Sequence, residues 1–290
     1  MKILIADKLS PKAITTLNKI GAEITSNPDL KAEELSDAIG SANVLIVRST
    51  KVYAETIEAG KSLELIIRAG AGVNNIDLEK ASSSGVYVAN CPGKNSDAVA
   101  ELALGHIIAC DRRIVDASLD LRSGNWKKKA YQNAAGLKGR TLGIIGLGSI
   151  GSALAKLAKG LDMNVIAWSR NLTPDKADAL DLVYCKSIAE VAANADAVSV
   201  HLAVTPDTKH LLNTKFFNKM KDEAIFVNTS RGEIVDTAAL HKAIDEKTLR
   251  VGLDVFENEP GSGLAEFDQT DLAGSITCTP HIAASTNQAS

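Results

Sequence analysis

The sequence lacks paired cysteines. Its four cysteines are scattered over 290 residues, and none of the spacings between them is that of a redox motif or a zinc site. In a chain of this length, scattered cysteines are typical of the reduced thiols of a cytosolic protein. We therefore expect a cytoplasmic protein with neither a disulfide framework nor a metal centre. The four are Cys91, Cys110, Cys185 and Cys278.

Long hydrophobic runs and an excess of one charge are also missing. No apolar stretch approaches the roughly 20 residues that a membrane helix needs, and the apolar start at Ile3–Ala6 is too short for a signal peptide. The formal net charge is −3, so the overall charge gives no attraction to nucleic acid. We expect a protein that binds neither membranes nor nucleic acid.

What the sequence does contain is a regular alternation of short apolar runs and helical stretches. Continuous runs such as Val44–Val47 are typical of parallel strands buried on both faces. The rhythm begins again at Leu142, after one long helical stretch predicted from Asp97 to Ser123. This pattern predicts the α/β class, with two doubly wound parallel-sheet domains and a cleft between them. The other predicted strands are 3–6, 65–67, 86–88, 142–145, 164–168, 197–202, 225–227, 250–253 and 275–277, and the other helices are 11–20 and 152–161.

Three glycines follow the strand that starts at Leu142, in the spacing Gly146-x-Gly148-x-x-Gly151. The first permits a tight turn, the second lets the backbone approach a pyrophosphate, and the third lets strand and helix pack closely. The helix that follows offers N–H groups and a partial positive charge at its first residues, Ser149 and Ile150. Because the motif lies between a strand and a helix, it predicts a dinucleotide site.

The next strand ends in an unusual pair. Domains of this kind usually place an acidic residue there, which accepts hydrogen bonds from the adenosine ribose. Here the residues are Ser169 and Arg170, so no carboxylate repels a 2′-phosphate, and Arg170 carries the charge to pair with one. Two interpretations stay open: use of NADP or a relaxed choice of cofactor, or an arginine that simply extends into solvent.

Near the end of the chain, three polar segments directly follow predicted strands. Because the carboxyl ends of parallel strands line the ligand crevice of an open α/β sheet, we expect Arg231, a carboxylate and His281 to converge. His281 suits removal of a hydroxyl proton near neutral pH, and Arg231 suits a substrate carboxylate. Glu259 or the competing Glu257 would stabilise the imidazolium. This set of residues predicts hydride transfer at a 2-hydroxy acid. The segments are 227–232, 254–260 and 279–286.

These segments and the glycine loop resemble the signatures of the D-isomer-specific 2-hydroxyacid dehydrogenases, in the family order and over essentially the whole chain. The resemblance implies NAD as cofactor, a homodimer or homotetramer, and Glu259 rather than Glu257 as the partner of His281. It also implies a flavodoxin-like substrate domain of residues 1–97, joined by 283–290, and a Rossmann NAD(P)-binding domain of residues 98–282. Further cofactor contacts implied by the family pattern are His201, Ala203, Thr208, Thr229, Ser230, Asp254 and Ala283.

Within this family the chain most resembles the members that act on D-3-phosphoglycerate. Arg48 and Arg68 follow or end predicted strands, and two guanidinium groups can bind a phosphate through several charge-assisted hydrogen bonds. The alternative is that both are surface or ion-paired arginines. The loop 70–72 would offer backbone N–H groups to a carboxylate. The predicted substrate contacts are Arg48, Ser49, Arg68, Gly70, Ala71, Gly72 and Asn95.

Three functions follow as hypotheses. The leading one is oxidation of D-3-phosphoglycerate to 3-phosphohydroxypyruvate, the first committed step toward serine. Ser169 and Arg170 support an alternative, an NADPH-dependent glyoxylate or hydroxypyruvate reductase. The third is a nucleotide-sensing corepressor that binds protein partners, although the sequence offers no acidic tail for it. Residues from Ser285 on resemble the start of a helix that continues in the family, and the sequence leaves open whether that helix is absent or trimmed.

Overall fold

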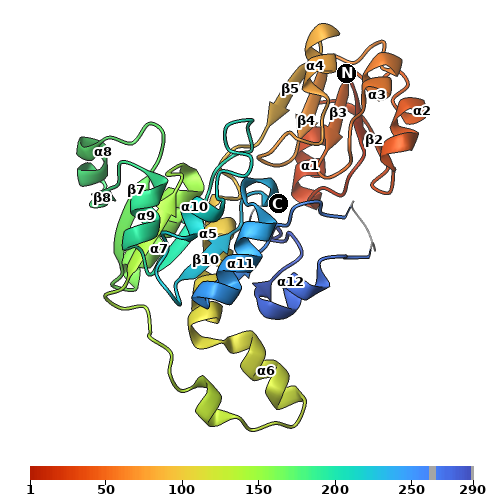
Figure 1. The fold of residues 1–290 in the computed structure, drawn as a ribbon. Coiled ribbons are helices and arrows are strands. Elements are labelled where there is room, and N and C mark those ends of the chain that lie inside the picture. Colours follow the sequence, from red (N-terminus) through yellow and green to blue (C-terminus); the bar gives the residue numbers. More distant parts are fainter. Residues whose placement is uncertain (261–265, 289–290) are drawn as a thin grey trace. The chain divides into compact units, whose positions relative to one another are not determined.

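The computed structural model describes residues 1–260 and 266–288. The chain divides into two compact units, each built on its own parallel sheet (Figure 1). Unit 1 comprises Met1–Asn95 and the described chain from Asn287 on, and unit 2 comprises residues 96–260 and 266–286. The prediction of an α/β protein with two parallel-sheet domains is thereby confirmed.

Unit 1 contains five parallel strands in the order β2-β1-β3-β4-β5, which is the flavodoxin-like order. Strand β3 is buried along its whole length because successive side chains enter cores on opposite faces: Leu45 joins one core, and Ile46 joins the other. The elements are β1 Lys2–Ile5, α1 Pro11–Lys19, β2 Glu23–Ser26, η1 Ala32–Glu34, α2 Leu35–Ala38, β3 Val44–Val47, α3 Ala54–Ala59, β4 Leu65–Arg68, α4 Leu78–Ser83 and β5 Tyr87–Asn90.

Unit 2 contains seven parallel strands in the order β12-β11-β10-β9-β6-β7-β8. Helices α5 and α7 contribute to the core on one face of this sheet, and α9, α10 and α11 to the core on the other. The chain order reverses between β6 and β9, which makes their carboxyl ends the place where ligands bind in such folds. The first elements are α5 Ser96–Arg112, α6 Ile114–Arg122, η2 Lys128–Tyr131, β6 Thr141–Ile145, α7 Ser149–Gly160, β7 Asn164–Trp168, α8 Pro174–Ala179 and β8 Val183–Tyr184. The others are α9 Ile188–Asn194, β9 Ala197–Val200, α10 Thr214–Phe217, β10 Ile225–Asn228, η3 Gly232–Ile234, α11 Thr237–Lys247, β11 Arg250–Leu253, α12 Thr270–Ser275 and β12 Thr277–Cys278.

The structure corrects several sequence-based expectations. The single helix expected from Asp97 to Ser123 is two helices, because Arg113 adopts a left-handed conformation (φ 51°) between α5 and α6. Strands β2 and β8 were not predicted, because both lie at sheet edges and neither has a continuous apolar run. The strand expected at 275–277 is shorter and later, since α12 extends to Ser275. The chain makes turns as far as residue 288, and the continuation of the helix expected from Ser285 lies outside the described residues.

Within the described ranges 1–260 and 266–288, no helix combines the length and apolar character required to cross a bilayer. The same ranges hold no cluster of three His, Cys, Asp or Glu side chains arranged to bind a metal ion.

Candidate functional site

The glycine loop lies between β6 and α7, at the point where the strand order of unit 2 reverses. Gly146 has φ +99°, and a Cβ there would lie 2.6 Å from the carbonyl oxygen of His201. A Cβ on Gly151 would lie 2.3 Å from the carbonyl oxygen of Gly146, so these two glycines allow the loop to close against β9 and α7. Gly148 instead faces open space, with no atom within 4 Å of an added Cβ. The loop is thus tight on its inner side and accessible where α7 begins with Ser149, whose N–H lacks a partner within the helix.

A cavity of about 600 Å³ opens beside this loop. Ser169, at the end of β7, contributes to its wall, and Arg170 is the exposed residue that follows. Lys176 of α8 also lines the cavity and donates to the carbonyl oxygen of Asn171 at 3.3 Å. No Asp or Glu is among the lining residues, which are Leu147, Gly148, Ser169, Asn171, Leu172, Lys176, Ala179 and Leu180. The cavity therefore has a cationic rather than an anionic side chain in its wall.

The loop after β9 forms the other side of the switch point. Thr208 Oγ1 accepts from the backbone N–H of Thr205 at 2.7 Å and donates to the carbonyl oxygen of Ala203 at 2.7 Å, which holds the loop in one shape. His201 Nε2 contacts Ser199 Oγ at 3.0 Å. Burial lowers the pKa of His201 to about 4, so its imidazole is neutral at pH 7.

The turn after β10 is held by a residue that the sequence did not single out. Asn228 is fully buried; its Oδ1 accepts from the N–H of Ser230 at 2.9 Å and from the Ser230 hydroxyl at 2.8 Å. Its Nδ2 donates to the carbonyl oxygen of Arg231 at 2.8 Å. An asparagine directly after a strand can bond nearby backbone in this way, and its position after β10 is the sequence signal for this role. These three hydrogen bonds of the Asn228 side chain fix the turn that carries Thr229, Ser230 and Arg231.

Gly232 brings the arginine turn against the loop that carries the two glutamates. A Cβ on Gly232 would lie 2.0 Å from the carbonyl carbon of Phe256, so only glycine permits this approach of two backbones. In the second loop, Glu259 Oε1 accepts from the backbone N–H of Phe256 at 2.9 Å. The carboxylate of Glu259 is thereby oriented by its own loop before it meets another side chain.

The other carboxylate oxygen of Glu259, Oε2, lies 2.6 Å from Nδ1 of His281. A carboxylate accepts hydrogen bonds, so Nδ1 carries a proton and Nε2 is the ring nitrogen left for proton transfer. The hydrogen bond and charge of Glu259 raise the pKa of His281 above 6.5, against the opposing effects of burial and of Arg231. Burial would raise the pKa of Glu259, but its bonds to His281 and Phe256 and the charges of His281 and Arg231 hold it below 4.5. With 49% of its side chain exposed, His281 is accessible to a substrate.

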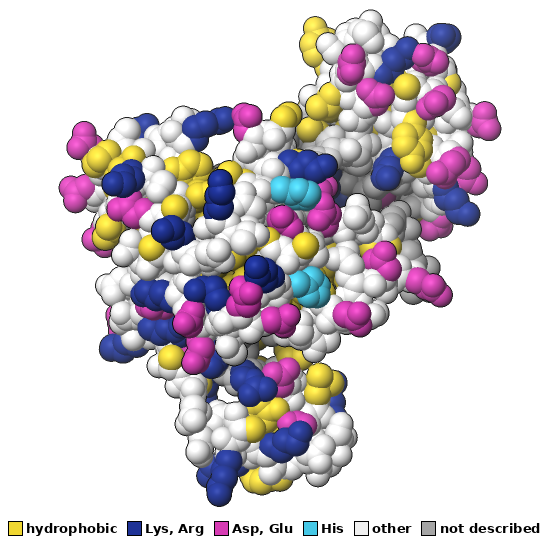
Figure 2. All heavy atoms as spheres, viewed as in Figure 1, with side chains coloured by type: hydrophobic (Ala, Val, Ile, Leu, Met, Phe, Trp, Pro, Cys, Tyr) yellow, Lys and Arg dark blue, Asp and Glu magenta, His cyan; other side chains and the backbone are white. Residues whose placement is uncertain are grey.

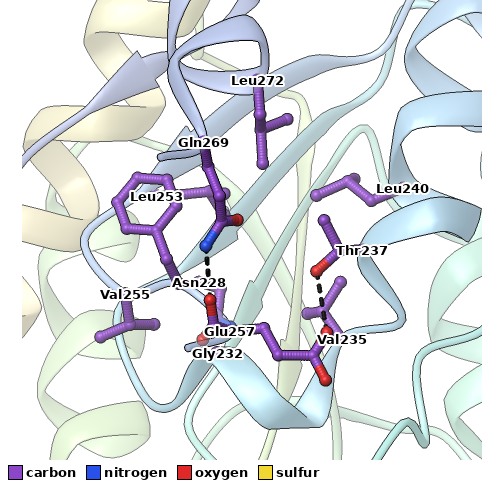
Figure 3. A pocket seen from close by; sticks show the side chains of 11 residues that line it. Asn228, Gly232, Val235, Thr237, Leu240, Leu253, Val255, Glu257, Gln269 and Leu272 are labelled. Carbon is purple, nitrogen blue, oxygen red and sulfur yellow. Dashed lines mark hydrogen bonds between the residues drawn. The ribbon is translucent and has the colours of Figure 1, made fainter. Parts of the chain in front are cut away.

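Glu257 has a different set of contacts. Its Oε1 lies 2.6 Å from Nε2 of His210, and its Oε2 accepts from the hydroxyl of Thr237 at 3.1 Å. Gln269 donates to its backbone carbonyl, and Glu257 lines a small cavity together with Thr237 and Gln269 (Figure 3). At about 10 Å³ this cavity is far too small for a substrate. Of the two candidate carboxylates, Glu259 is the one in contact with His281.

Asp254 is fully buried and holds the segment that carries His281. Its Oδ1 accepts from the backbone N–H of Ile282 and its Oδ2 from that of Ala283, both at 2.9 Å. The hydroxyl of Thr279 donates to Oδ1 at 2.6 Å. A carboxylate has about four acceptor sites, so these three bonds leave capacity for one further donor, such as an amide. The family resemblance implies Asp254 as a cofactor contact, and the structure adds a structural role that no local sequence pattern indicates.

The predicted substrate residues lie in unit 1. Arg68 ends β4 opposite Val47 of β3, so Arg48 and Arg68 stand at the carboxyl ends of neighbouring strands. Asp7, which is not among the predicted site residues, accepts from the backbone N–H groups of Arg48, Ser49 and Thr50 at 2.6, 3.1 and 3.1 Å. The guanidinium of Arg68 lies against Gly70, where an added Cβ would be only 1.5 Å from Nη1.

The 70–72 loop is held from β5: Asn90 Nδ2 donates to the carbonyl oxygen of Ala71 at 2.6 Å, and Cys91 N–H donates to that of Gly70 at 2.9 Å. Gly72 is half-buried beside them, and Asn95 is the last residue of unit 1 before α5. The predicted substrate residues of unit 1 are thus gathered at the carboxyl ends of β3 and β4 and in the loops that follow, apart from Asn95.

The residues of unit 2 fit a bound nicotinamide dinucleotide. In the glycine loop, Gly146 and Gly151 pack against backbone atoms, whereas Gly148 faces open space. The cavity of about 600 Å³ adjoins Gly148. Two buried polar atoms in the residues that directly follow β9 and β10, His201 Nδ1 and Thr229 Oγ1, have no hydrogen-bond partner within the part of the chain that the structure describes. Buried polar groups normally have partners, so a polar ligand would satisfy them.

Comparison with known proteins agrees with this geometry. Residues 104–283 match the family described as D-isomer specific 2-hydroxyacid dehydrogenase, NAD binding domain. The chain is 40% identical to a hydroxypyruvate reductase of Thermotoga maritima, over 99% of this chain and 93% of that protein. It is 39% identical to a D-3-phosphoglycerate dehydrogenase of Archaeoglobus fulgidus, over 100% of this chain but only 54% of that protein, so the chain spans about half the length of this relative.

Among solved structures, the TT0316 protein of Thermus thermophilus superimposes with a TM-score of 0.87 at 34% identity, covering 100% of this chain and 92% of that one. The likeness therefore extends over both units of the chain and not only over the nucleotide-binding motif. The chain belongs to the D-isomer specific 2-hydroxyacid dehydrogenase family.

Proposed function

We propose that this protein is a nicotinamide-dependent dehydrogenase that interconverts a D-2-hydroxy acid and the corresponding 2-keto acid. The observation that carries the proposal is the 2.6 Å contact between Glu259 and His281, next to the turn that presents Arg231. A bound nicotinamide supplies the hydride acceptor or donor. The chain must then supply a proton acceptor for the hydroxyl group and a cation for the carboxylate.

The roles of the side chains follow from their chemistry. His281 Nε2 takes the hydroxyl proton during oxidation and returns it during reduction, because Nδ1 is committed to Glu259. Glu259 stabilises the resulting imidazolium, as the raised pKa of His281 indicates. Arg231 binds the substrate carboxylate with its planar set of donors and polarises the reacting oxygen.

For the substrate we propose D-3-phosphoglycerate. Support comes from Arg48 and Arg68, which stand on neighbouring strands of unit 1 and provide two cations for a phosphate. The test is steady-state turnover on matched substrates: 3-phosphoglycerate and 3-phosphohydroxypyruvate against glycerate, hydroxypyruvate and glyoxylate. We expect a kcat/KM at least tenfold higher for the phosphorylated acids. Equal values with and without the phosphate would reject this substrate, and no turnover of any of them would reject the dehydrogenase itself.

A second candidate is an NADPH-dependent hydroxypyruvate or glyoxylate reductase. It is favoured by the cavity beside the glycine loop, whose wall contains Lys176 and no carboxylate, and by Arg170, the exposed residue that follows Ser169 of that wall. A 2′-phosphate would find two cations there, whereas the ribose of NAD would lack its usual acidic acceptor. Direct titration with NAD, NADH, NADP and NADPH, followed by protein fluorescence or calorimetry, distinguishes the two cofactors independently of the substrate.

We also propose that the protein self-associates through α6. Every residue of this helix is at least partly exposed, and the helix extends away from the sheet of unit 2 (Figure 1). Hydrophobic side chains are exposed over it (Figure 2). An apolar surface of this kind is typical of a protein interface. The exposed large hydrophobic residues in and after the helix are Ile114 at 50%, Val115 at 40%, Leu119 at 56%, Leu121 at 56% and Trp126 at 81%.

A further inference from the structure

A buried histidine outside the proposed catalytic set lies beneath the segment that carries His281. His106 belongs to α5, is only 3% exposed, and packs against β11. The close approach requires Gly252, since a Cβ at that position would lie 2.8 Å from the Cβ of His106. An imidazole is a costly core residue unless its polar atoms are used. A leucine would fill similar space without that cost, so the hydrogen bond that His106 makes is the feature to explain.

His106 Nε2 lies 3.1 Å from the hydroxyl oxygen of Thr279. That hydroxyl has a single proton, which it donates to Oδ1 of Asp254 at 2.6 Å, because an anionic carboxylate is the strongest acceptor available. Thr279 Oγ1 therefore accepts from His106, and His106 must carry its proton on Nε2. Burial lowers the pKa of His106, against an opposing effect of the Asp254 charge, so it donates as a neutral group.

Asp254 in turn holds the backbone of His281 and of the two residues that follow it. The carboxylate of Asp254 binds the N–H groups of Ile282 and Ala283, and its backbone carbonyl accepts from the N–H of His281 at 2.8 Å. Between these bonds His281 has φ +50°, a left-handed conformation that is unfavourable for a residue with a Cβ. Such a conformation persists only where its surroundings impose it. The hydrogen bonds that Asp254 accepts from the N–H groups of His281, Ile282 and Ala283 impose it here.

We infer that His106 is a positioning residue for His281: by donating to Thr279 it fixes the hydroxyl on Asp254, and Asp254 fixes the backbone that aims the imidazole at Glu259. The inference rests on the proposed function for its catalytic meaning and on the hydrogen-bond chain for its geometry. It predicts that a change at residue 106, in the middle of a core helix, alters the titration of an exposed imidazole far along the chain. A residue that only fills the core would alter stability alone.

The test compares His106→Leu, which removes the donor, with His106→Gln, whose side-chain amide keeps an N–H at a similar reach. Proton NMR of the imidazole Cε1–H signals reports the pKa of His281 in the full-length protein, and assignment uses a His281→Gln variant. The charged groups around His281 are Glu259, Arg231 and Asp254, and none of these is changed. We expect His106→Leu to lower the pKa of His281 toward 6.5 and kcat by roughly tenfold, and His106→Gln to stay within about twofold of wild type.

Two further variants separate positioning from packing. Ile107→Val changes the fully buried neighbour of His106 in the same helix and should lower the melting temperature while leaving the titration of His281 unchanged. Thr279→Val removes the hydroxyl with little change of shape and should lower the pKa of His281 as His106→Leu does. If the leucine variant does not fold, Thr279→Val alone provides the test. A wild-type titration of His281 in folded His106→Leu or Thr279→Val protein would overturn the inference. If the wild type turns over no 2-hydroxy or 2-keto acid, the proposed function fails, whereas the NMR comparison still decides this inference.

Discussion

Glu259 binds the Nδ1 side of His281 at 2.6 Å while its second oxygen is held by the backbone N–H of Phe256. The carboxylate is thus fixed by its own loop, and the imidazole is oriented against a fixed acceptor. This differs from a surface ion pair between two flexible side chains, in which ordering both partners cancels much of the attraction. The arrangement determines which ring nitrogen is protonated, and several consequences can be measured.

Replacing Glu259 with Gln should lower kcat by about 10²-fold or more, because the imidazolium formed during oxidation loses its counter-charge and the Nδ1–H tautomer loses its anionic acceptor. The pH profile of kcat/KM should show the pKa of the essential base moving downward, since Glu259 is the main cause of its upward shift in the wild type. Glu257→Gln is the matched control, because that carboxylate contacts His210 and Thr237 instead. A profile that moves equally in both variants would contradict the assignment.

The same pair should make stability depend on pH in a defined window. The native pKa of His281 is raised, so its contribution is complete below about pH 6.5 and is lost as the pH rises through the native value. The native pKa of Glu259 is lowered, so its contribution is present above about pH 4.5 and is lost as the pH falls through the native value. The coupling between them should therefore be largest between these limits.

A double-mutant cycle of Glu259→Gln and His281→Gln, measured by urea unfolding from about pH 4 to about pH 9, checks this window. Because the His281 side chain is 49% exposed, solvent screening keeps the expected coupling energy at about 1 kcal/mol or less. It should fall toward zero at both ends of the pH range. A coupling that is constant across the range would mean that the two side chains interact without their charges.

Much of the nucleotide site could be predicted because its signals are local. The three glycines act within six residues of sequence, and strand ends place Arg231 and His281 at one edge of a sheet. The supporting network could not be predicted in the same way. His106 meets Thr279 across 173 positions, and the role of Asp254 depends on backbone N–H groups 28 and 29 positions away. The first contact exists only once α5 packs on β11, and the second only once β12 pairs with β11, and no periodicity in the sequence encodes either.

Cofactor preference should change with two cations beside the glycine loop. Arg170→Ala and Lys176→Ala should each raise the Kd for NADP by about tenfold, because a charge-assisted hydrogen bond contributes about 1.5–3 kcal/mol, and should leave the Kd for NAD nearly unchanged. Isothermal titration calorimetry measures both. Lys242→Ala, a lysine of α11 paired with Glu246, controls for a general loss of positive charge. Wild-type NADP affinity in both variants would show that neither side chain contacts a 2′-phosphate.

Substrate choice should depend on the two arginines of unit 1. Arg48→Ala and Arg68→Ala should each raise the KM for 3-phosphohydroxypyruvate by about tenfold or more, since each removes a cation from the proposed phosphate site. The KM for hydroxypyruvate, which lacks the phosphate, serves as the control and should change by less than about twofold. An equal rise for both acids would instead assign these arginines to the part of the substrate that the two compounds share.

Self-association should depend on the apolar surface of α6. Leu119 is 56% exposed at the middle of this helix, and Leu119→Lys would place a charge where the proposed interface excludes water. Sedimentation velocity should show the wild type as a dimer or tetramer and the variant shifted toward the monomer at micromolar concentration. Leu161→Lys is the matched control, because Leu161 is also exposed (39%) but follows α7. If Leu119→Lys sediments like the wild type, or if Leu161→Lys dissociates it equally, the association surface lies elsewhere.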